Sequence, residues 1–277
     1  MNPARAAQPA RGWSREPLFA FAFLLLTLNG LTTFFGGAVA AQGWSVAALN
    51  LFDISAIVWL ALAAGLALLW SAPAWDLLRA GDRVVLSGAL LAALLPVAAV
   101  SSLCLTGLAV WCLRTGAPGA PLRRAGIVFL SLTAFLLWGR IALAWGAGPL
   151  LTADARFVAW LAGTQSLGNA VEFADGTRFL IAPGCSSLHG VSLALILWTT
   201  VVQYFGLATD RRAWATLALA VTASIAVNGA RLAVIAWHPH DFAYWHGGTG
   251  AALFGWIALI ILTAVIYRGL GHARRPD

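Results

Sequence analysis

Long apolar stretches separated by short polar breaks dominate the chain. They cover residues 18–40, 46–70, 84–113, 125–148, 185–207, 213–237 and 248–267. Each has the length of about 20 residues that an α-helix needs to cross the hydrocarbon core of a membrane. The pattern predicts an all-α polytopic membrane protein that forms one integral membrane domain over residues 1–277.

The number of crossings depends on the third apolar stretch. Residues 84–113 would form about 45 Å of helix, whereas two full crossings need roughly 60 Å. Either this stretch is a shortened helical hairpin broken near Pro96, or its first helix begins earlier, near Trp75, or the N-terminus lies outside. We therefore expect seven or eight transmembrane helices.

The arginines predict the orientation of the later helices. They occur in the breaks at 114–124 and 208–212 and in the C-terminal tail, which the positive-inside tendency assigns to the cytoplasm. Segments 149–184 and 238–247 then lie on the outer side. The first of them contains two short alternating stretches, 169–173 and 177–181, around Asp175-Gly176. This pattern predicts a small extracytoplasmic β-hairpin before Cys185.

Composition excludes several classes of protein. Of the 277 residues 61% are hydrophobic and 10% charged, which disfavours a cytosolic enzyme or a disordered chain. All 17 basic residues are arginine and they form no stripe along one face, so the net charge of +7 does not indicate nucleic-acid binding. Three cysteines without a CxxC motif indicate neither a disulfide framework nor a metal site, and we expect no cofactor and no metal.

Cys185 is the first residue that could perform chemistry. It follows the Pro183-Gly184 turn at the start of a predicted helix, near the outer membrane surface. Unpaired N–H groups and the helix dipole at such a position stabilise a thiolate. Cys104 and Cys112 lie within apolar stretches, and we interpret them as structural thiols.

Arg231 is the second candidate, because an ionisable residue within a span usually faces a partner or a wet cavity. It lies six residues before Trp237, about 9 Å below the outer end of its helix. Asn228 lies one turn away and also needs a partner. Arg140 and Asp53, in the predicted fourth and second spans, could be a structural ion pair, and the sequence leaves this open.

Histidine could supply the base that a thiol nucleophile requires. His246 begins the last span, and His189 lies at i+4 from Cys185, on the same helix face. His238-Pro-His240 also suggests metal binding, but no further ligand pattern accompanies it. Cys185, Arg231 and His246 are predicted at one depth, which suits a nucleophile, an electrostatic stabiliser and a base.

Three motifs in consecutive spans resemble the exosortase/archaeosortase family of membrane cysteine proteases and transpeptidases. They are Gly-Cys-Ser-Ser-Leu at 184–188, Asn-Gly-Ala-Arg at 228–231 and His-Gly-Gly-Thr-Gly at 246–250. The resemblance covers about residues 125–267, which would be the catalytic core. The sequence departs from the family's Cys-Ser-Gly pattern at Ser187, where the family has glycine.

The resemblance implies that Cys185 is the nucleophile, Arg231 the catalytic arginine and His246 the catalytic histidine. Supporting candidates are Ser186, Ser187, His189 and Asn228. The implied substrates are secreted proteins with a C-terminal tail made of a short motif, a transmembrane helix and a basic end (a PEP-CTERM-like tail). They would be cleaved through a Cys thioester at the outer face of a prokaryotic cytoplasmic membrane, with water or a surface acceptor resolving the thioester.

Three other functions compete with this interpretation. A transporter or channel would line a path with Arg231, Arg140 and Asp53, but no pair of broken helices in matching halves supports it. A haem- or quinone-binding carrier would need histidines facing each other inside spans. A non-catalytic membrane assembly factor is the third alternative.

Overall fold

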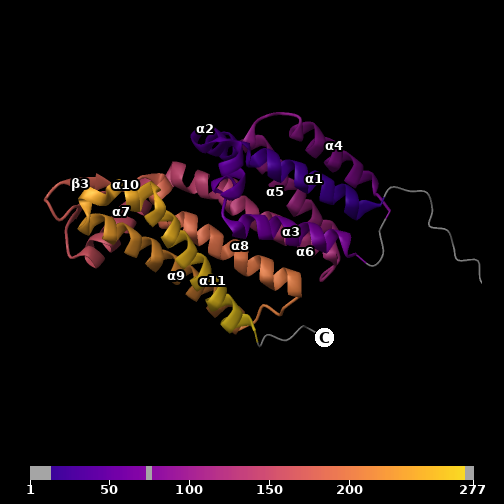
Figure 1. Ribbon diagram of the computed structural model, residues 1–277. Helices are drawn as coiled ribbons and strands as arrows, with labels where there is room; N and C mark the ends of the chain where they lie inside the picture. The colour runs from indigo at the N-terminus through magenta and orange to yellow at the C-terminus, as the bar shows by residue number, and fades with distance from the viewer. Residues whose placement is uncertain (1–13, 73–76, 272–277) are drawn as a thin grey trace, which may run out of the picture.

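The computed structural model describes residues 14–72 and 77–271, which form an elongated helical bundle (Figure 1). Its longer helices are α1 (Arg15–Gly30), α2 (Thr32–Leu49), α3 (Ala56–Trp70), α4 (Ala80–Ala93), α5 (Ala98–Thr115), α6 (Pro121–Thr133), α7 (Gly139–Ala162), α8 (Ser187–Phe205), α9 (Arg211–Trp237) and α11 (Thr249–Leu270). A short helix, α10 (Phe242–Gly247), precedes α11. The prediction of an all-α fold is confirmed at this level.

Several helices have the length and composition of membrane spans. Among the described residues, five helices qualify: α5, the continuous α6–α7 helix, α8, α9 and α11. The pair α1 and α2, bent by 47° at their junction, would be a sixth, and α3 is apolar but shorter. These helices make the chain a helical membrane protein.

The predicted span at 46–70 is not one helix. It breaks after α2, where Leu51, Phe52 and Asp53 have φ between 53° and 58°, a left-handed conformation that no helix continues through. Asp53 therefore lies in a turn, where its Oδ2 accepts a hydrogen bond from Gln42 Nε2 (2.8 Å). The prediction that Asp53 lies within a span was wrong.

The predicted span at 84–113 breaks around Pro96 into α4 and α5, as in the hairpin alternative. Proline has no N–H to donate and favours an extended residue before it, which explains a break at this position. α4 and α5 pack against each other and against α1. The first half of the chain therefore contributes more, and shorter, helices than the apolar stretches suggest.

The predicted span at 125–148 continues well beyond Gly148. α6, a π-helical turn at Ala134–Trp138 and α7 form one helix of 42 residues, from Pro121 to Ala162. Pro149 lies inside α7, and the non-helical backbone at Gly146 relieves the clash that proline causes with the preceding turn. The continuation carries Asp154 toward Cys185, as described below.

A three-stranded antiparallel sheet follows α7. Its strands are β1 (Ser166–Leu167), β2 (Ala170–Glu172) and β3 (Arg178–Leu180), in the order β1-β2-β3. The turn between β2 and β3 is fixed by Asp175, whose Oδ1 accepts hydrogen bonds from the Thr177 N–H (2.9 Å) and hydroxyl (2.6 Å). These bonds hold the pKa of the Asp175 carboxyl below its ordinary value.

Aromatic packing joins the helices of the main core. Phe23 of α1 and Phe129 of α6 stack with their ring centroids 4.0 Å apart. Gly65 of α3 leaves room for the same Phe129 ring, which a Cβ at that position would meet at 2.7 Å. A smaller core lies beneath the sheet and includes Val171, Ile181, Leu232 and Ile235.

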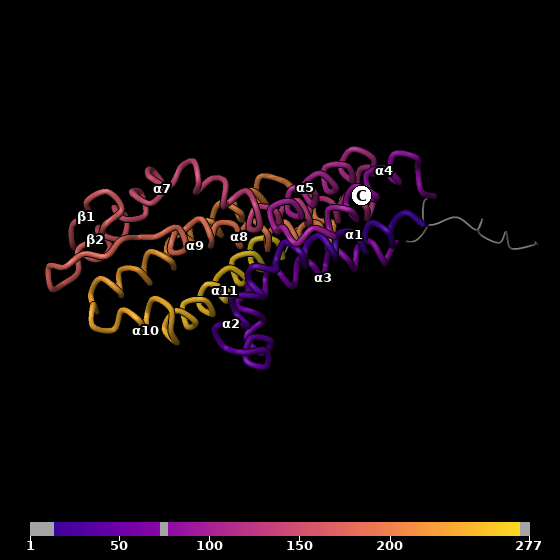
Figure 2. Tube along the Cα trace, turned by 90° about the horizontal axis from the view of Figure 1, so that it is seen from above, coloured from indigo at the N-terminus to yellow at the C-terminus, as the bar shows by residue number. Residues whose placement is uncertain are grey.

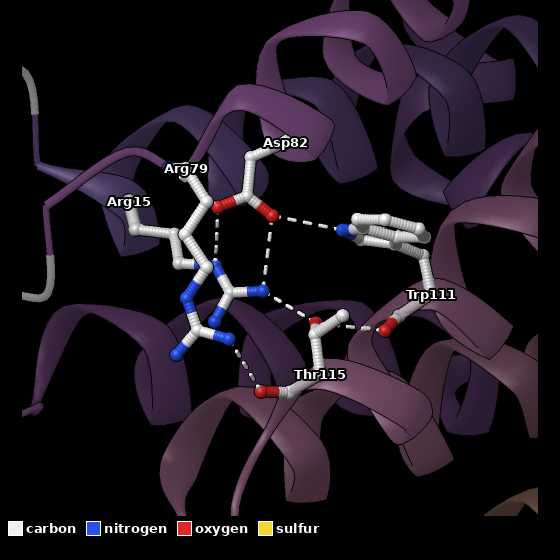
Figure 3. Close-up of polar contacts among 5 residues, drawn as sticks. All are labelled: Arg15, Arg79, Asp82, Trp111 and Thr115. Carbon is white, nitrogen blue, oxygen red and sulfur yellow. Dashed lines mark hydrogen bonds and ion pairs between the residues drawn. The ribbon is translucent and has the colours of Figure 1, made fainter.

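A buried ion pair ties the first helices together at one end of the bundle (Figure 3). Arg15 of α1 and Asp82 of α4 approach to 2.9 Å with side chains 1% and 0% exposed. Asp82 also accepts from Trp111 Nε1 (2.8 Å) and from the Arg79 N–H (3.0 Å), while Arg15 donates to Thr115 Oγ1. Since α1 and α4 start here and α5 ends here, the cluster aligns three helix ends.

Candidate functional site

Cys185 and His246 meet at the end of the bundle opposite the Arg15–Asp82 pair. Cys185 Sγ lies 3.0 Å from His246 Nε2, although 61 residues separate them in the sequence. Figure 2 shows the surrounding elements gathered at this end: the sheet, α10 and one end of α7 and of α9. Cys185 is buried and His246 exposed, so the pair is reached from the surface on the histidine side.

A short turn positions Cys185 immediately before α8. Residues 183–185 form one 3₁₀ turn in which the Cys185 N–H donates to the Ala182 carbonyl (2.9 Å). Ser186 then caps α8, its hydroxyl accepting from the Leu188 N–H (3.2 Å). Proline at the start of the turn and serine at the cap favour this geometry. Cys185 thus precedes the helix rather than beginning it.

Asp154 of α7 is a site residue that the sequence did not reveal. Its Oδ2 accepts from Ser186 Oγ (2.9 Å) and from the Ser187 N–H (3.0 Å). A carboxylate at a helix N-terminus satisfies free N–H groups and complements the helix dipole. Asp154 therefore holds the segment next to Cys185. Its only signal in the sequence is an acidic residue in the stretch after the expected end of the fourth span.

Asn228 of α9 clamps the same segment from the other side. Its Nδ2 donates to the Cys185 carbonyl (2.9 Å) and to Ser187 Oγ (3.3 Å). The expectation that Asn228 needs a partner near Arg231 is thereby met through the cysteine segment. The contact also gives the Ser187 hydroxyl a role that glycine at this position could not fill.

Arg231, one turn after Asn228, is half-buried beside the thiol. Its Nε is shielded from solvent and has no hydrogen-bond partner among the described residues. Its charge lies within electrostatic range of both Cys185 and His189. A buried donor without a partner costs about 1–3 kcal/mol, so Arg231 is suited to bind an incoming oxygen.

The backbone N–H groups at the start of α8 already donate hydrogen bonds within the protein. The Ser186 N–H donates to the Pro183 carbonyl (3.3 Å), and the Ser187 and Leu188 N–H groups bond as described above. The expected unpaired N–H groups next to the cysteine are therefore occupied in this conformation. Stabilisation of negative charge near the sulfur rests on the Arg231 side chain.

The other histidines of the described chain either pack elsewhere or are exposed, away from the Cys185 thiol. His189 packs edge-on against Phe135, with ring centroids 5.3 Å apart. His238 and His240 are exposed in the connection between α9 and α10. Within the part of the chain that the structure describes, no three His, Cys, Asp or Glu residues gather as metal ligands would.

Arg140 and Asp53 lie apart from the Cys185–His246 pair. Arg140 extends over the ring of Phe34, 5.9 Å from its centroid, and Asp53 bonds to Gln42. Arg140 and Asp53 thus have separate partners instead of the ion pair that the sequence left open. Two cavities of about 470 and 410 Å³ lie at the opposite end of the bundle, near Arg124 and Arg15.

Comparison with protein-family models, curated proteins and solved structures finds no match to this chain. The chemistry of the site is therefore argued from its geometry. A thiol in contact with an imidazole, beside a guanidinium whose Nε has no partner in the described part of the chain, has the parts of a nucleophile, a base and an oxyanion stabiliser.

Proposed function

We propose that the chain is a membrane cysteine endopeptidase or transpeptidase of the exosortase/archaeosortase type. The observation that carries the proposal is the 3.0 Å contact between Cys185 Sγ and His246 Nε2, with Arg231 beside it. A nucleophile within hydrogen-bond reach of its base is the arrangement that covalent catalysis requires.

The reaction begins with transfer of the Cys185 proton to His246. The thiolate adds to a substrate peptide carbonyl, and the Arg231 guanidinium stabilises the oxyanion. The C–N bond breaks as the His246 imidazolium protonates the leaving amine, which leaves a thioester on Cys185. Water or an acceptor amine then attacks the thioester and gives its proton to His246. The C–S bond breaks to release the acid or the new amide, and the Cys185 thiolate takes the proton back from the His246 imidazolium.

Helix lengths support a site at the outer membrane boundary. Cys185 lies about 20 residues before the end of α8, and Arg231 about 20 residues after the start of α9. α11, which begins three residues after His246, is 22 residues long. At 1.5 Å per residue, each distance corresponds to roughly 30 Å, the thickness of the hydrocarbon core.

The substrates we infer are secreted proteins with a short motif, a transmembrane helix and a basic end. When the substrate helix lies in the membrane, a motif just outside it is level with Cys185. With the arginine-rich ends of the helices in the cytoplasm, the active site faces outward from a prokaryotic cytoplasmic membrane.

Of the seven or eight crossings expected, we propose eight, because the starts of α1, α4 and α6 and the end of α5 lie near one another.

The test is cleavage of a secreted reporter fused to each of a panel of candidate C-terminal tails from the same genome. It is co-expressed with wild type, with Cys185→Ala and with a control, Cys104→Ala, that alters a half-buried thiol of α5. Wild type and the control should process at least one tail, and Cys185→Ala should accumulate the full-length reporter. Equal processing by wild type and Cys185→Ala, or no processing of any tail, contradicts the proposal.

A further inference from the structure

The strand that leads into the nucleophile is an edge strand. In the order β1-β2-β3, β3 (Arg178–Leu180) pairs with β2 on one side only. Five residues after Leu180 the chain reaches Cys185. An unpaired strand edge is a template for another strand, because its N–H and C=O groups lack partners.

The register identifies the backbone groups that face away from β2. The Ile181 N–H donates to the Asn169 carbonyl (2.9 Å), and the Phe173 N–H donates to the Thr177 carbonyl (2.6 Å). In an antiparallel ladder successive residues direct their N–H and C=O groups to opposite sides. The N–H and C=O groups of Thr177, Phe179 and Ile181 therefore face β2. The N–H and C=O groups of Arg178 and Leu180 consequently point to the free edge.

This free edge is open along its length. The outward backbone groups of Arg178 and Leu180 have no hydrogen-bond partner among the described residues. Their side chains are on the accessible side of the sheet, Arg178 with 53% and Leu180 with 69% exposed, while Phe179 between them is buried. A hydrophobic side chain of this exposure beside an unpaired edge is a feature that sheet proteins usually avoid.

Aromatic contacts connect the same strand to the catalytic histidine. Phe179 lies 6.3 Å from Phe242 of α10, centroid to centroid. Phe242 in turn stacks on the His246 ring at 4.8 Å and 13°. β3 is thus linked to Cys185 along the chain and to His246 through aromatic packing.

We propose that the free edge of β3 binds the substrate segment beside the scissile bond as an added antiparallel or parallel β-strand. This inference rests on the proposed protease function and specifies how the substrate is held. The ligand class is an extended peptide, bound through backbone hydrogen bonds to Arg178 and Leu180. Because the strand period is two, every second substrate residue must supply an N–H to the edge.

Proline substitution in the enzyme tests the edge directly. Leu180→Pro removes an outward N–H but no bond of the β2–β3 ladder, and prolines are tolerated at such edge positions. The matched control, Ser166→Pro, removes an outward N–H from β1 on the opposite edge, since Ser166 pairs with Val171 at a non-hydrogen-bonded position. Leu180→Ala separates the loss of the side chain from the loss of the N–H.

In the reporter assay, Leu180→Pro should lower the processing rate by about tenfold or more relative to Leu180→Ala. Ser166→Pro should process like wild type. The rate at which iodoacetamide alkylates Cys185 should be the same in all three variants, because the site itself is intact. Equal processing by Leu180→Pro and Leu180→Ala would overturn the inference.

Proline scanning of the reporter gives an independent result that does not alter the enzyme. Proline at successive positions beside the scissile bond should block processing at alternate positions and be tolerated between them. Sensitivity without this alternation would refute strand addition, even if Leu180→Pro disturbs the fold. Wild type and Cys185→Ala are run in parallel. Equal cleavage by these two refutes the proposed protease function. Cys185-dependent cleavage without alternation refutes only the binding of substrate at the β3 edge.

Discussion

At position 231, arginine and lysine would bind an oxyanion differently although both carry one positive charge. A guanidinium presents several donors in a planar fork, whereas an ammonium is a compact point charge on a flexible stem. The Arg231 Nε has no partner among the described residues, so its N–H can donate a hydrogen bond to the oxyanion of the proposed reaction.

Arg231→Lys should lower the processing rate by about 100-fold or more, the usual cost of removing an oxyanion-stabilising donor. The protein should reach the membrane in normal amounts, as measured by immunoblot. Arg140→Lys is the control, because Arg140 lies over Phe34 away from the site and should process normally. Near-normal cleavage by Arg231→Lys would refute the role assigned to Arg231.

Asp154→Ala should slow processing by about tenfold, because it leaves the Ser187 N–H and the Ser186 hydroxyl without their acceptor. Loss of an acceptor at a helix N-terminus typically costs about 0.5–2 kcal/mol. Asp154→Asn keeps an acceptor oxygen and should recover most of the rate. Arg156→Ala, an exposed change on the same helix, is the control. If Asp154→Ala processes like this control, Asp154 does not position the cysteine segment.

Close contact between α7 and α9 sets the position of Asp154 and Asn228, which hold the segment around Cys185. Gly229 of α9 is buried, and a Cβ added to it would lie 2.4 Å from the ring of Phe157. Gly229→Ala should therefore lower the thermal unfolding temperature in detergent, by an amount equivalent to about 1–3 kcal/mol. Gly107→Ala, in α5 with open space around it, should be neutral or stabilising by up to about 1 kcal/mol. Equal stability of the two variants would show that α7 and α9 do not pack so closely.

The buried Arg15–Asp82 pair should be essential for the packing of α1, α4 and α5. Asp82→Ala leaves the Arg15 guanidinium buried without its carboxylate and removes the acceptor of Trp111. Breaking one partner of a buried pair typically costs about 3–5 kcal/mol. Glu172→Ala breaks the exposed pair with Arg178 and should cost less than about 1 kcal/mol. Thermal unfolding of both variants measures the difference, and comparable losses would contradict the structural role of the cluster.

The arginines in the connections at 114–124 and 208–212 lie at the end of the bundle opposite the proposed active site (Figure 1). Cysteine introduced at exposed His240, beside the active site, should react with a membrane-impermeant maleimide on intact cells. Cysteine introduced at exposed Thr209, in the connection between α8 and α9, should react only after lysis. The native cysteines are replaced in both variants. The reverse labelling pattern would invert the proposed orientation.

Local patterns along the chain were sufficient to predict the class of fold and the chemical groups available. Helix-forming apolar stretches, the alternation around Asp175-Gly176 and the turn before Cys185 are local signals, readable because length, period and turn chemistry act within a few residues. They did not locate the left-handed turn at 51–53 or the continuation of α7 through Pro149, because packing decides whether a helix tolerates a break.

Which side chains meet depends on packing between elements that are distant in the sequence. The sequence offered both His189, on the same helix face as Cys185, and His246, at the same predicted depth, and the family resemblance singled out His246. Packing of α10 against the sheet brings His246 to the sulfur, while His189 faces Phe135. The contact of Asp154 with the start of α8 likewise depends on a bond across 32 residues. Such contacts follow from how helices cross and bend, which no local pattern along the chain specifies.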